Sequence, residues 1–176
     1  MSKVTLVTGH YWGSKRRAGF HHLAQAYHKL GYEVLFFTAP MSYLLKIKGD
    51  YRFEYDLEQE AGRLLQKEAN LYSYLHFTHW HPANFRLKLL NIVTQPFLPL
   101  YSGYSFPDAA QFIKESELIV FESTPGLFLF ERFKSINPSA KYIYRVSDDL
   151  RLLNVHPGLI RHEEKILKEF DLVSVP

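Results

Sequence analysis

Short apolar runs alternate with amphipathic segments along the whole chain, and this alternation constrains the fold more than any other feature of the sequence. The apolar runs have the length and the β-branched and aromatic content of buried strands. We predict strands at residues 3–9, 32–40, 70–78, 117–123, 141–146 and 171–176. Such an alternation is typical of a parallel sheet that has helices on both faces and right-handed crossovers.

The amphipathic segments predict the helices. In the first, Phe20, Leu23 and Tyr27 recur at helical spacing, and Gly31 stands where a helix often ends. We predict helices within residues 17–31, 56–70, 85–93, 108–116, 126–137 and 158–170. The predicted fold class is α/β: a Rossmann-like three-layer domain with a mainly parallel sheet of six or more strands. We expect the strand order 3-2-1-4-5-6, which places the ends of strands 1 and 4 side by side at a crevice.

Length and composition indicate one domain over residues 1–176. A chain of 176 residues with 47% hydrophobic content is large enough to bury roughly two-thirds of the surface that its unfolded form exposes. The chain has no cysteine and therefore no disulfide, which suits a reducing compartment. Because the sequence stops at Pro176 inside an apparent strand, we expect it to be a fragment of a longer protein.

Three classes of protein are disfavoured by the sequence. The most apolar long segment, residues 91–106, contains Pro96 and Pro99 and falls short of the ~20 apolar residues that a membrane-spanning helix needs. The first residues lack a signal-peptide cleavage site, so we expect no secretory leader. The net charge of +3, from 21 basic and 18 acidic residues, is a mild bias, and we expect no nucleic-acid partner.

Polar residues follow several predicted strands at the edge where ligands bind in parallel sheets. They are His10, Glu122, Ser123, Arg145, Ser147, Asp148 and Asp149. The acidic residues and His10 have an ordinary structural explanation: the acidic residues can cap a turn or helix, and His10 can be a polar loop residue. The functional alternative is that Glu122 binds substrate hydroxyls or orients a catalytic group, and that Asp148 takes part in catalysis. Residue types alone leave both alternatives open.

The loop after the first strand concentrates positive charge. Lys15, Arg16 and Arg17 stand just before a predicted helix. The N-terminus of a helix carries a partial positive charge, which attracts anions and is slightly destabilised by nearby cations. The loop can therefore bind an external phosphate, or it can be ordinary surface charge. Its glycines do not have the G-x-G-x-x-G spacing of a dinucleotide site, so we reject NAD as a cofactor.

An aromatic and basic stretch spans residues 72–87 and includes several histidines. Rings and cations in such a mixture suit the boundary between water and an anionic lipid surface, and we expect the stretch to help dock the protein on a membrane. His76, His79 and His81 raise the possibility of a metal site. In neither a helix nor a strand do all three share a face, and no nearby cysteine or aspartate completes a ligand set. We therefore predict no metal.

The motifs of this chain, in their order and spacing, resemble those of the N-terminal domain of bacterial GT-B glycosyltransferases, most closely the xanthan-pathway glucuronosyltransferase family. They are GHYWGSKRRAGFHH at residues 9–22, KGDYR at 48–52, IVFES at 119–123, INPSAK at 136–141 and YRVSDDL at 144–150. The resemblance implies an inverting transfer of glucuronic acid from UDP-glucuronic acid to a lipid-linked sugar, without a metal, at the cytoplasmic face of the cell membrane. A second, donor-binding domain is implied beyond this chain.

The resemblance also implies roles for individual residues. The Asp of the family's Ser-Asp step corresponds to Asp148, which becomes the predicted catalytic base, because an inverting transferase must deprotonate the acceptor hydroxyl. Arg16 and Arg17 are expected to hold the acceptor's diphosphate. The predicted set comprises Asp148 as base, His10, Arg16, Arg17, Glu122 and Ser123 as acceptor-binding residues, and Arg145, Ser147 and Asp149 as supporting residues.

The predicted partners follow from the same implication: a lipid-linked saccharide acceptor, a membrane surface on which the protein is peripheral, and a UDP-linked sugar that is a substrate rather than a cofactor. An alternative is a non-enzymatic subunit that docks on the membrane and binds the acceptor for a separate catalytic chain. A general nucleotide-binding domain is the least favoured alternative, because the sequence has no phosphate-loop signature.

Overall fold

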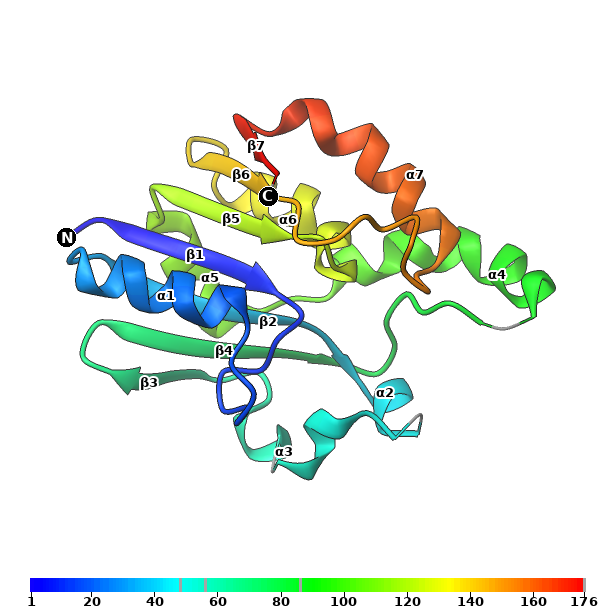
Figure 1. Ribbon diagram of the computed structural model, residues 1–176, viewed down its shortest axis with the longest axis horizontal. Coiled ribbons are helices and arrows are strands. Elements are labelled where there is room, and N and C mark those ends of the chain that lie inside the picture. Colours follow the sequence, from blue (N-terminus) through cyan, green and yellow to red (C-terminus); the bar gives the residue numbers. More distant parts are fainter. Residues whose placement is uncertain (48, 56, 86, 176) are drawn as a thin grey trace.

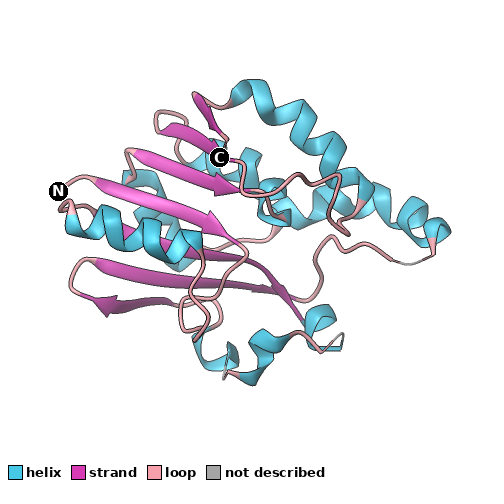
Figure 2. Ribbon diagram, in the orientation of Figure 1, coloured by secondary structure: helices cyan, strands magenta, loops and turns pink. Residues whose placement is uncertain are grey.

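The computed structural model describes residues 1–47, 49–55, 57–85 and 87–175 as an α/β fold (Figure 1). Within these ranges the strands form one sheet in the order β3-β4-β2-β1-β5-β6-β7 (Figure 2). The strands are β1 (Lys3–Thr8), β2 (Glu33–Ser42), β3 (Leu64–Glu68), β4 (Leu71–Thr78), β5 (Leu118–Glu122), β6 (Lys141–Arg145) and β7 (Leu172–Ser174).

The predicted strand order is confirmed. The six predicted strands correspond to β1, β2, β4, β5, β6 and β7, and they lie in the order 3-2-1-4-5-6 with parallel pairing throughout. β1 and β5 are therefore neighbours at the centre of the sheet, and the connections that leave them diverge. The ends of β1, β5 and β6 consequently meet at one edge.

One predicted helix is wrong in part. Of residues 56–70, Asp56 lies outside the described residues, and the helix α3 covers only Leu57–Glu60. Gly62 has φ +72°, a left-handed conformation that a helix cannot continue through. The chain then forms β3, which pairs antiparallel with β4 at the edge of the sheet and carries partly exposed, charged residues, as an edge strand commonly does.

A second difference concerns Pro40, at which β2 was expected to stop. The strand continues to Ser42, and its register against β4 shifts between Thr38 and Met41. An irregularity at this point accommodates a proline, which cannot donate a ladder hydrogen bond. The extension carries β2 beyond the end of β1, while its last residue, Ser42, still pairs with Thr78 of β4.

The helices cover the two faces of the sheet unequally. α1 (Gly19–Lys29) packs Phe20 and Ala24 on one face, against Val4, Leu6 and Phe36. The other face is covered by α5 (Pro107–Glu115), α6 (Phe130–Ile136), α7 (Pro157–Ile166) and the 3₁₀ helices η2 (Gln95–Gly103) and η3 (Pro125–Leu129). This larger core is rich in aromatic rings. The remaining elements are α2 (Tyr43–Ile47), η1 (Tyr51–Glu54), α4 (Lys88–Thr94) and η4 (Leu167–Glu169).

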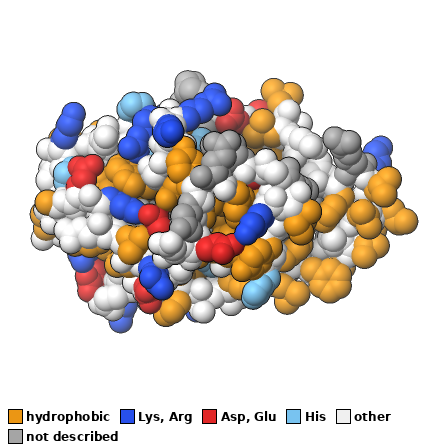
Figure 3. All heavy atoms as spheres, turned by 90° about the horizontal axis from the view of Figure 1, so that it is seen from below, with side chains coloured by type: hydrophobic (Ala, Val, Ile, Leu, Met, Phe, Trp, Pro, Cys, Tyr) orange, Lys and Arg blue, Asp and Glu red, His pale blue; other side chains and the backbone are white. Residues whose placement is uncertain are grey.

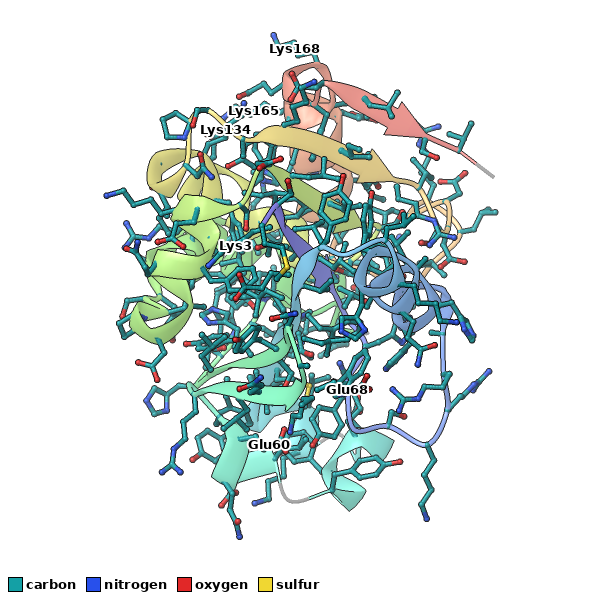
Figure 4. The ribbon with its side chains drawn as sticks, turned by 90° about the vertical axis from the view of Figure 1, so that its left-hand side faces the viewer. Lys3, Glu60, Glu68, Lys134, Lys165 and Lys168 are labelled. Carbon is teal, nitrogen blue, oxygen red and sulfur yellow. The ribbon has the colours of Figure 1, made fainter. Side chains whose placement is uncertain are left out.

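The edge at which the parallel strands begin is closed by ion pairs. Figure 4 views this side and labels Lys3, whose Nζ lies 3.2 Å from Glu33 and 2.8 Å from Glu115. The carboxyl edge is built differently, as described below. Among the described residues, every helix is too short or too polar to cross a lipid bilayer.

Candidate active site at the carboxyl edge of the sheet

A row of polar side chains crosses the carboxyl edge of the sheet. Thr38 pairs with Thr8, Glu122 with Arg145, and Arg145 with Ser174, while Thr8 and Glu122 directly follow the paired residues Val7 and Phe121. Successive residues of a strand point to opposite faces, so the row lies on the face covered by α1. The preceding residues, among them Phe121 and Tyr144, point into the larger core. At the ends of β1, β5 and β6, the sequence therefore places one core residue and then one polar residue.

Glu122 is the centre of this row. Its side chain is buried, and its carboxylate accepts hydrogen bonds from the Thr8 hydroxyl and from the Gly9 N–H at 3.3 Å. Oε1 lies 3.6 Å from His10 Nε2 and accepts a hydrogen bond from Ser147 Oγ at 3.3 Å. Burial by itself raises the pKa of Glu122, but the contacts with His10 and Thr8 outweigh it, and the pKa is lowered. The group is therefore a carboxylate at neutral pH.

His10 is held at the same edge by its backbone. Its N–H donates to Thr8 Oγ1 at 3.1 Å, and its C=O accepts a hydrogen bond from Thr38 Oγ1 at 2.8 Å. The ring remains about one-third exposed, with 35% relative exposure of the side chain. His10 can contact a ligand, because its backbone is held by hydrogen bonds, its ring lies beside a carboxylate, and part of the ring is exposed to solvent.

Ser123 anchors the loop that follows β6. Its buried hydroxyl accepts hydrogen bonds from the Ser147 N–H at 3.0 Å and from the Tyr144 hydroxyl at 3.2 Å. In the same loop, the Asp149 carboxylate accepts the Arg151 N–H at 2.9 Å, as a turn-capping residue does. Asp148 is exposed, and within the described residues its carboxylate has no hydrogen-bond or ion-pair partner.

Two clefts meet at this edge. The first, of about 410 Å³, is called the β7 cleft here because Ser174 and Val175 line it together with Gly19 and Arg145. The second, of about 380 Å³, is called the α2 cleft because Leu45 lines it. His10, Glu122 and Asp148 line both clefts. The structure thus brings together, from three different strand ends, side chains that the sequence predicts as site residues.

The α2 cleft contains two residues that sequence reasoning missed. Arg52 donates to the Gly9 C=O at 2.5 Å and holds both oxygens of Asp50 at 2.8 Å, and His81 Nδ1 lies 2.6 Å from Ser42 Oγ. Burial raises the pKa of Asp50, but the hydrogen bonds from Arg52 outweigh it, and the pKa is lowered. The motif at residues 48–52 was a signal for Arg52, although Lys48 lies outside the described residues. His81 had no signal beyond the histidine-rich stretch.

The structure does not bring Arg16 and Arg17 into either cleft. Both are exposed, and Arg17 donates to the Trp12 C=O at 2.9 Å while its guanidinium stacks on the Trp12 ring at 5.0 Å. Lys15 is exposed beside them, and its backbone N–H donates to Tyr55. The expected contact with an acceptor diphosphate therefore lies outside the two clefts and stays a prediction.

Most of the aromatic stretch at residues 72–87 is core rather than surface. Tyr74 and His76 are buried in β4, and burial lowers the pKa of His76 to about 4, so its ring is neutral at pH 7. His79 is exposed and stacks on Tyr43, while His81 belongs to the α2 cleft. Successive side chains of a strand point to opposite faces of the sheet, so alternate rings of β4 face the larger core and are removed from the surface.

Comparisons with known proteins agree with this architecture. Residues 6–176 match the model of the family described as glucuronosyltransferase GumK, N-terminal domain. The chain is also 28% identical over 170 residues to the UDP-glucuronate:glycolipid 2-beta-glucuronosyltransferase of Xanthomonas campestris pv. campestris. That alignment covers 97% of this chain and 42% of the relative, so the chain spans less than half of the relative's length. The predicted resemblance is confirmed, and the chain belongs to the family of glucuronosyltransferase GumK N-terminal domains.

Proposed function

We propose that this chain is the part of an inverting glycosyltransferase that binds the acceptor and carries the catalytic base, Asp148. One observation carries the proposal: Asp148 is an exposed carboxylate, without a partner among the described residues, at the junction of two clefts. A transferase must bring two substrates to one proton acceptor. Asp148 meets that requirement because it borders both clefts. A residue that only caps a turn need not border any cleft.

The reaction follows from this position. Asp148 accepts the proton of an acceptor hydroxyl as its oxygen attacks the anomeric carbon of the donor sugar. The new carbon–oxygen bond forms on the face opposite the leaving group, and the bond to the nucleotide diphosphate breaks, so that the diphosphate departs with the electron pair. Because attack and departure are on opposite faces, the anomeric configuration inverts. Glu122 acts here as a positioning residue that holds the His10 ring at the junction.

The two clefts suggest a division between the substrates. The α2 cleft combines apolar side chains, Leu45, Leu153 and Val155, with the polar groups of Arg52 and His81, a mixture that suits the faces and hydroxyls of a saccharide. We assign it to the acceptor. The β7 cleft, with Arg145 and Ser147, is assigned to the donor sugar. A UDP-linked donor is proposed because the relative's name specifies UDP-glucuronate.

An acceptor anchored in lipid requires the protein to reach a membrane. In Figure 1, α4 extends away from the sheet, and the space-filling view in Figure 3 has apolar side chains gathered at that end. The exposed apolar residues of α4, its approach and η2 are Leu87, Leu89, Leu90, Ile92, Val93, Phe97 and Leu100. A patch of this kind is unusual on a free surface and suits insertion at the headgroup boundary. The proposed membrane contact therefore lies just after the aromatic stretch that the sequence indicated.

Vesicle binding tests the membrane contact. Leu89→Glu with Ile92→Glu is expected to weaken binding to vesicles that contain phosphatidylglycerol, and Leu30→Glu, at an exposed leucine on α1's end, is the matched control. Replacing Lys15, Arg16 and Arg17 by Ala is expected to flatten the salt dependence, because exposed charges are screened over roughly 8–10 Å. Vesicle binding that is unchanged by both sets of substitutions would remove the membrane from the proposal.

A transferase assay tests the function as a whole. The full-length protein is offered a panel of UDP- and GDP-sugars with a polyprenyl-diphosphate-linked saccharide, and the configuration of the product is determined by NMR. Inverted product that depends on Asp148 is expected, whereas residues 1–176 alone are expected to fold without turning over substrate. A full-length protein that binds the acceptor but transfers sugar only when a second chain is added would favour the docking-subunit alternative.

A further inference from the structure

Arg145 is a cation in the β7 cleft that has no ion-pair partner among the described residues. Its side chain stands on the α1 face at the end of β6 and lines the β7 cleft. It packs with its guanidinium carbon 5.6 Å from the centre of the Phe20 ring and close to Gly19. Within the described residues, the guanidinium forms neither a hydrogen bond nor an ion pair. A half-buried group with five N–H donors is therefore available to a ligand.

The neighbouring acid does not neutralise Arg145. Glu122 is its partner in the register of β5 and β6, yet the carboxylate is directed to Thr8, Gly9 and His10 instead. Asp148 lines the same cleft without pairing with Arg145. Glu122 and Asp148 thus share the cleft with Arg145, but neither forms an ion pair with it. The guanidinium can therefore bind an anion that enters the cleft.

We infer that Arg145 binds an anionic group of the donor, either on the sugar ring or on the anomeric carbon, and this inference rests on the proposed function. Two groups of a nucleotide sugar fit: the carboxylate of a uronic acid, which is attached to the sugar ring, and the diphosphate, which is attached to the anomeric carbon itself. Both match the planar fork of a guanidinium, which can form two parallel hydrogen bonds to such oxygens. The guanidinium packs near the Phe20 ring and beside Gly19, and both Gly19 and Arg145 line the β7 cleft.

The two sources of the anion predict different specificity. If Arg145 binds the carboxylate, a neutral hexose leaves the guanidinium unpaired and is disfavoured, because an unmatched polar group in a site is costly. Arg145 is then the residue that selects a uronic acid. If it binds the diphosphate, it serves every nucleotide sugar equally.

Equilibrium binding to the full-length protein separates these sources. UDP-glucuronate, UDP-glucose and UDP are titrated calorimetrically into the wild type, Arg145→Gln and Arg145→Lys, and the kcat/KM of transfer is measured for the two sugars. Loss of a charge-assisted hydrogen-bonded pair is expected to weaken binding by roughly 10- to 100-fold in Arg145→Gln, with partial rescue in Arg145→Lys. Arg132→Gln, an exposed arginine on α6, is the matched control, and thermal melts check that each variant folds.

Each outcome decides something. A loss confined to UDP-glucuronate identifies the carboxylate, and an equal loss for all three ligands identifies the diphosphate. Binding of every ligand within twofold of the wild type in Arg145→Gln would overturn the inference, and so would a wild-type protein that binds none of them. A wild-type protein that binds UDP-glucuronate through Arg145 but transfers no sugar would refute the proposed function while leaving the inference intact.

Discussion

The carboxyl end of β5 and the loop after β6 each present an acidic residue to the same edge of the sheet, but the two acids have opposite surroundings. Glu122 is buried, with 5% relative exposure, and its oxygens are occupied by Thr8, Gly9, His10 and Ser147. Asp148 is exposed and has no such partners among the described residues. Both nevertheless line the same two clefts.

The difference shows how one edge can serve two purposes. A carboxylate whose oxygens already accept hydrogen bonds is stabilised as an anion and is a poor proton acceptor, because protonation would break those bonds. A carboxylate without partners can take up a proton at little structural cost. We therefore propose a structural role for Glu122, at the end of β5, and a catalytic role for Asp148, in the loop after β6. The following predictions test this difference in role.

The largest effect is expected from Asp148→Asn in the full-length protein. Removing a positioned proton acceptor is expected to lower kcat by roughly 10² to 10⁴. The free energy of unfolding is expected to change by less than about 0.5 kcal/mol, because the side chain is exposed and has no hydrogen-bond or ion-pair partner among the described residues. Steady-state transfer assays and urea unfolding provide the two measurements. Near-normal turnover would contradict the assignment of chemistry to this loop.

Glu122→Gln is expected to act on stability first. A neutral amide offers one acceptor oxygen in place of two, so it replaces the contacts of the carboxylate only in part, and the loss of charge-assisted bonds is expected to cost about 1–3 kcal/mol. For a chain of this size, each kcal/mol corresponds to roughly 2–4 °C in Tm. Calorimetry measures the shift. A variant with unchanged Tm would mean that Glu122 is less committed to the fold than its contacts indicate.

The pH dependence of stability tests whether Glu122 stabilises the folded protein as a carboxylate. The pKa of Glu122 is lowered in the folded protein, so its contribution to stability is fully present above the unfolded-state value, near 4.5. The contribution is lost as the pH falls through the lower, folded-state pKa. The difference in unfolding free energy between the wild type and Glu122→Gln should therefore be constant from pH 7 to about 5 and shrink below that, as measured by urea titration. A constant difference down to pH 2 would contradict the lowered pKa.

The sequence predicted the end of β5 and the loop after β6 because strand ends are easy to locate. Alternating strands and helices determine which edge is the carboxyl edge, so His10, Glu122 and Asp148 could be brought together without coordinates. Their opposite surroundings could not be predicted. Whether an acid at a strand end is buried depends on Thr8 and Gly9 of a neighbouring strand, which lie more than a hundred residues away in the chain.

The missed features share one physical cause. β3 follows a left-handed glycine and is stabilised by pairing with β4, a contact that local periodicity does not reveal. Arg52 reaches the site through a hydrogen bond to the Gly9 C=O from an irregular segment. Arg17, which the resemblance assigned to the acceptor's diphosphate, packs over the Trp12 ring and lines neither cleft, and its role stays a prediction. Side chains on irregular segments are positioned by tertiary contacts, whereas those at strand ends are positioned by the sheet.

The smallest effect is expected from Asp149→Asn, next to the proposed base. Asp149 accepts the Arg151 N–H through Oδ1 and lines neither cleft, and an asparagine side-chain oxygen can accept the same hydrogen bond. Turnover is therefore expected to fall by less than about threefold, and stability to stay within about 0.5 kcal/mol of the wild type. The same transfer assay and urea unfolding apply. If Asp149→Asn abolished transfer while Asp148→Asn did not, the base would be one residue further along the loop, and the chemistry would lie outside both clefts.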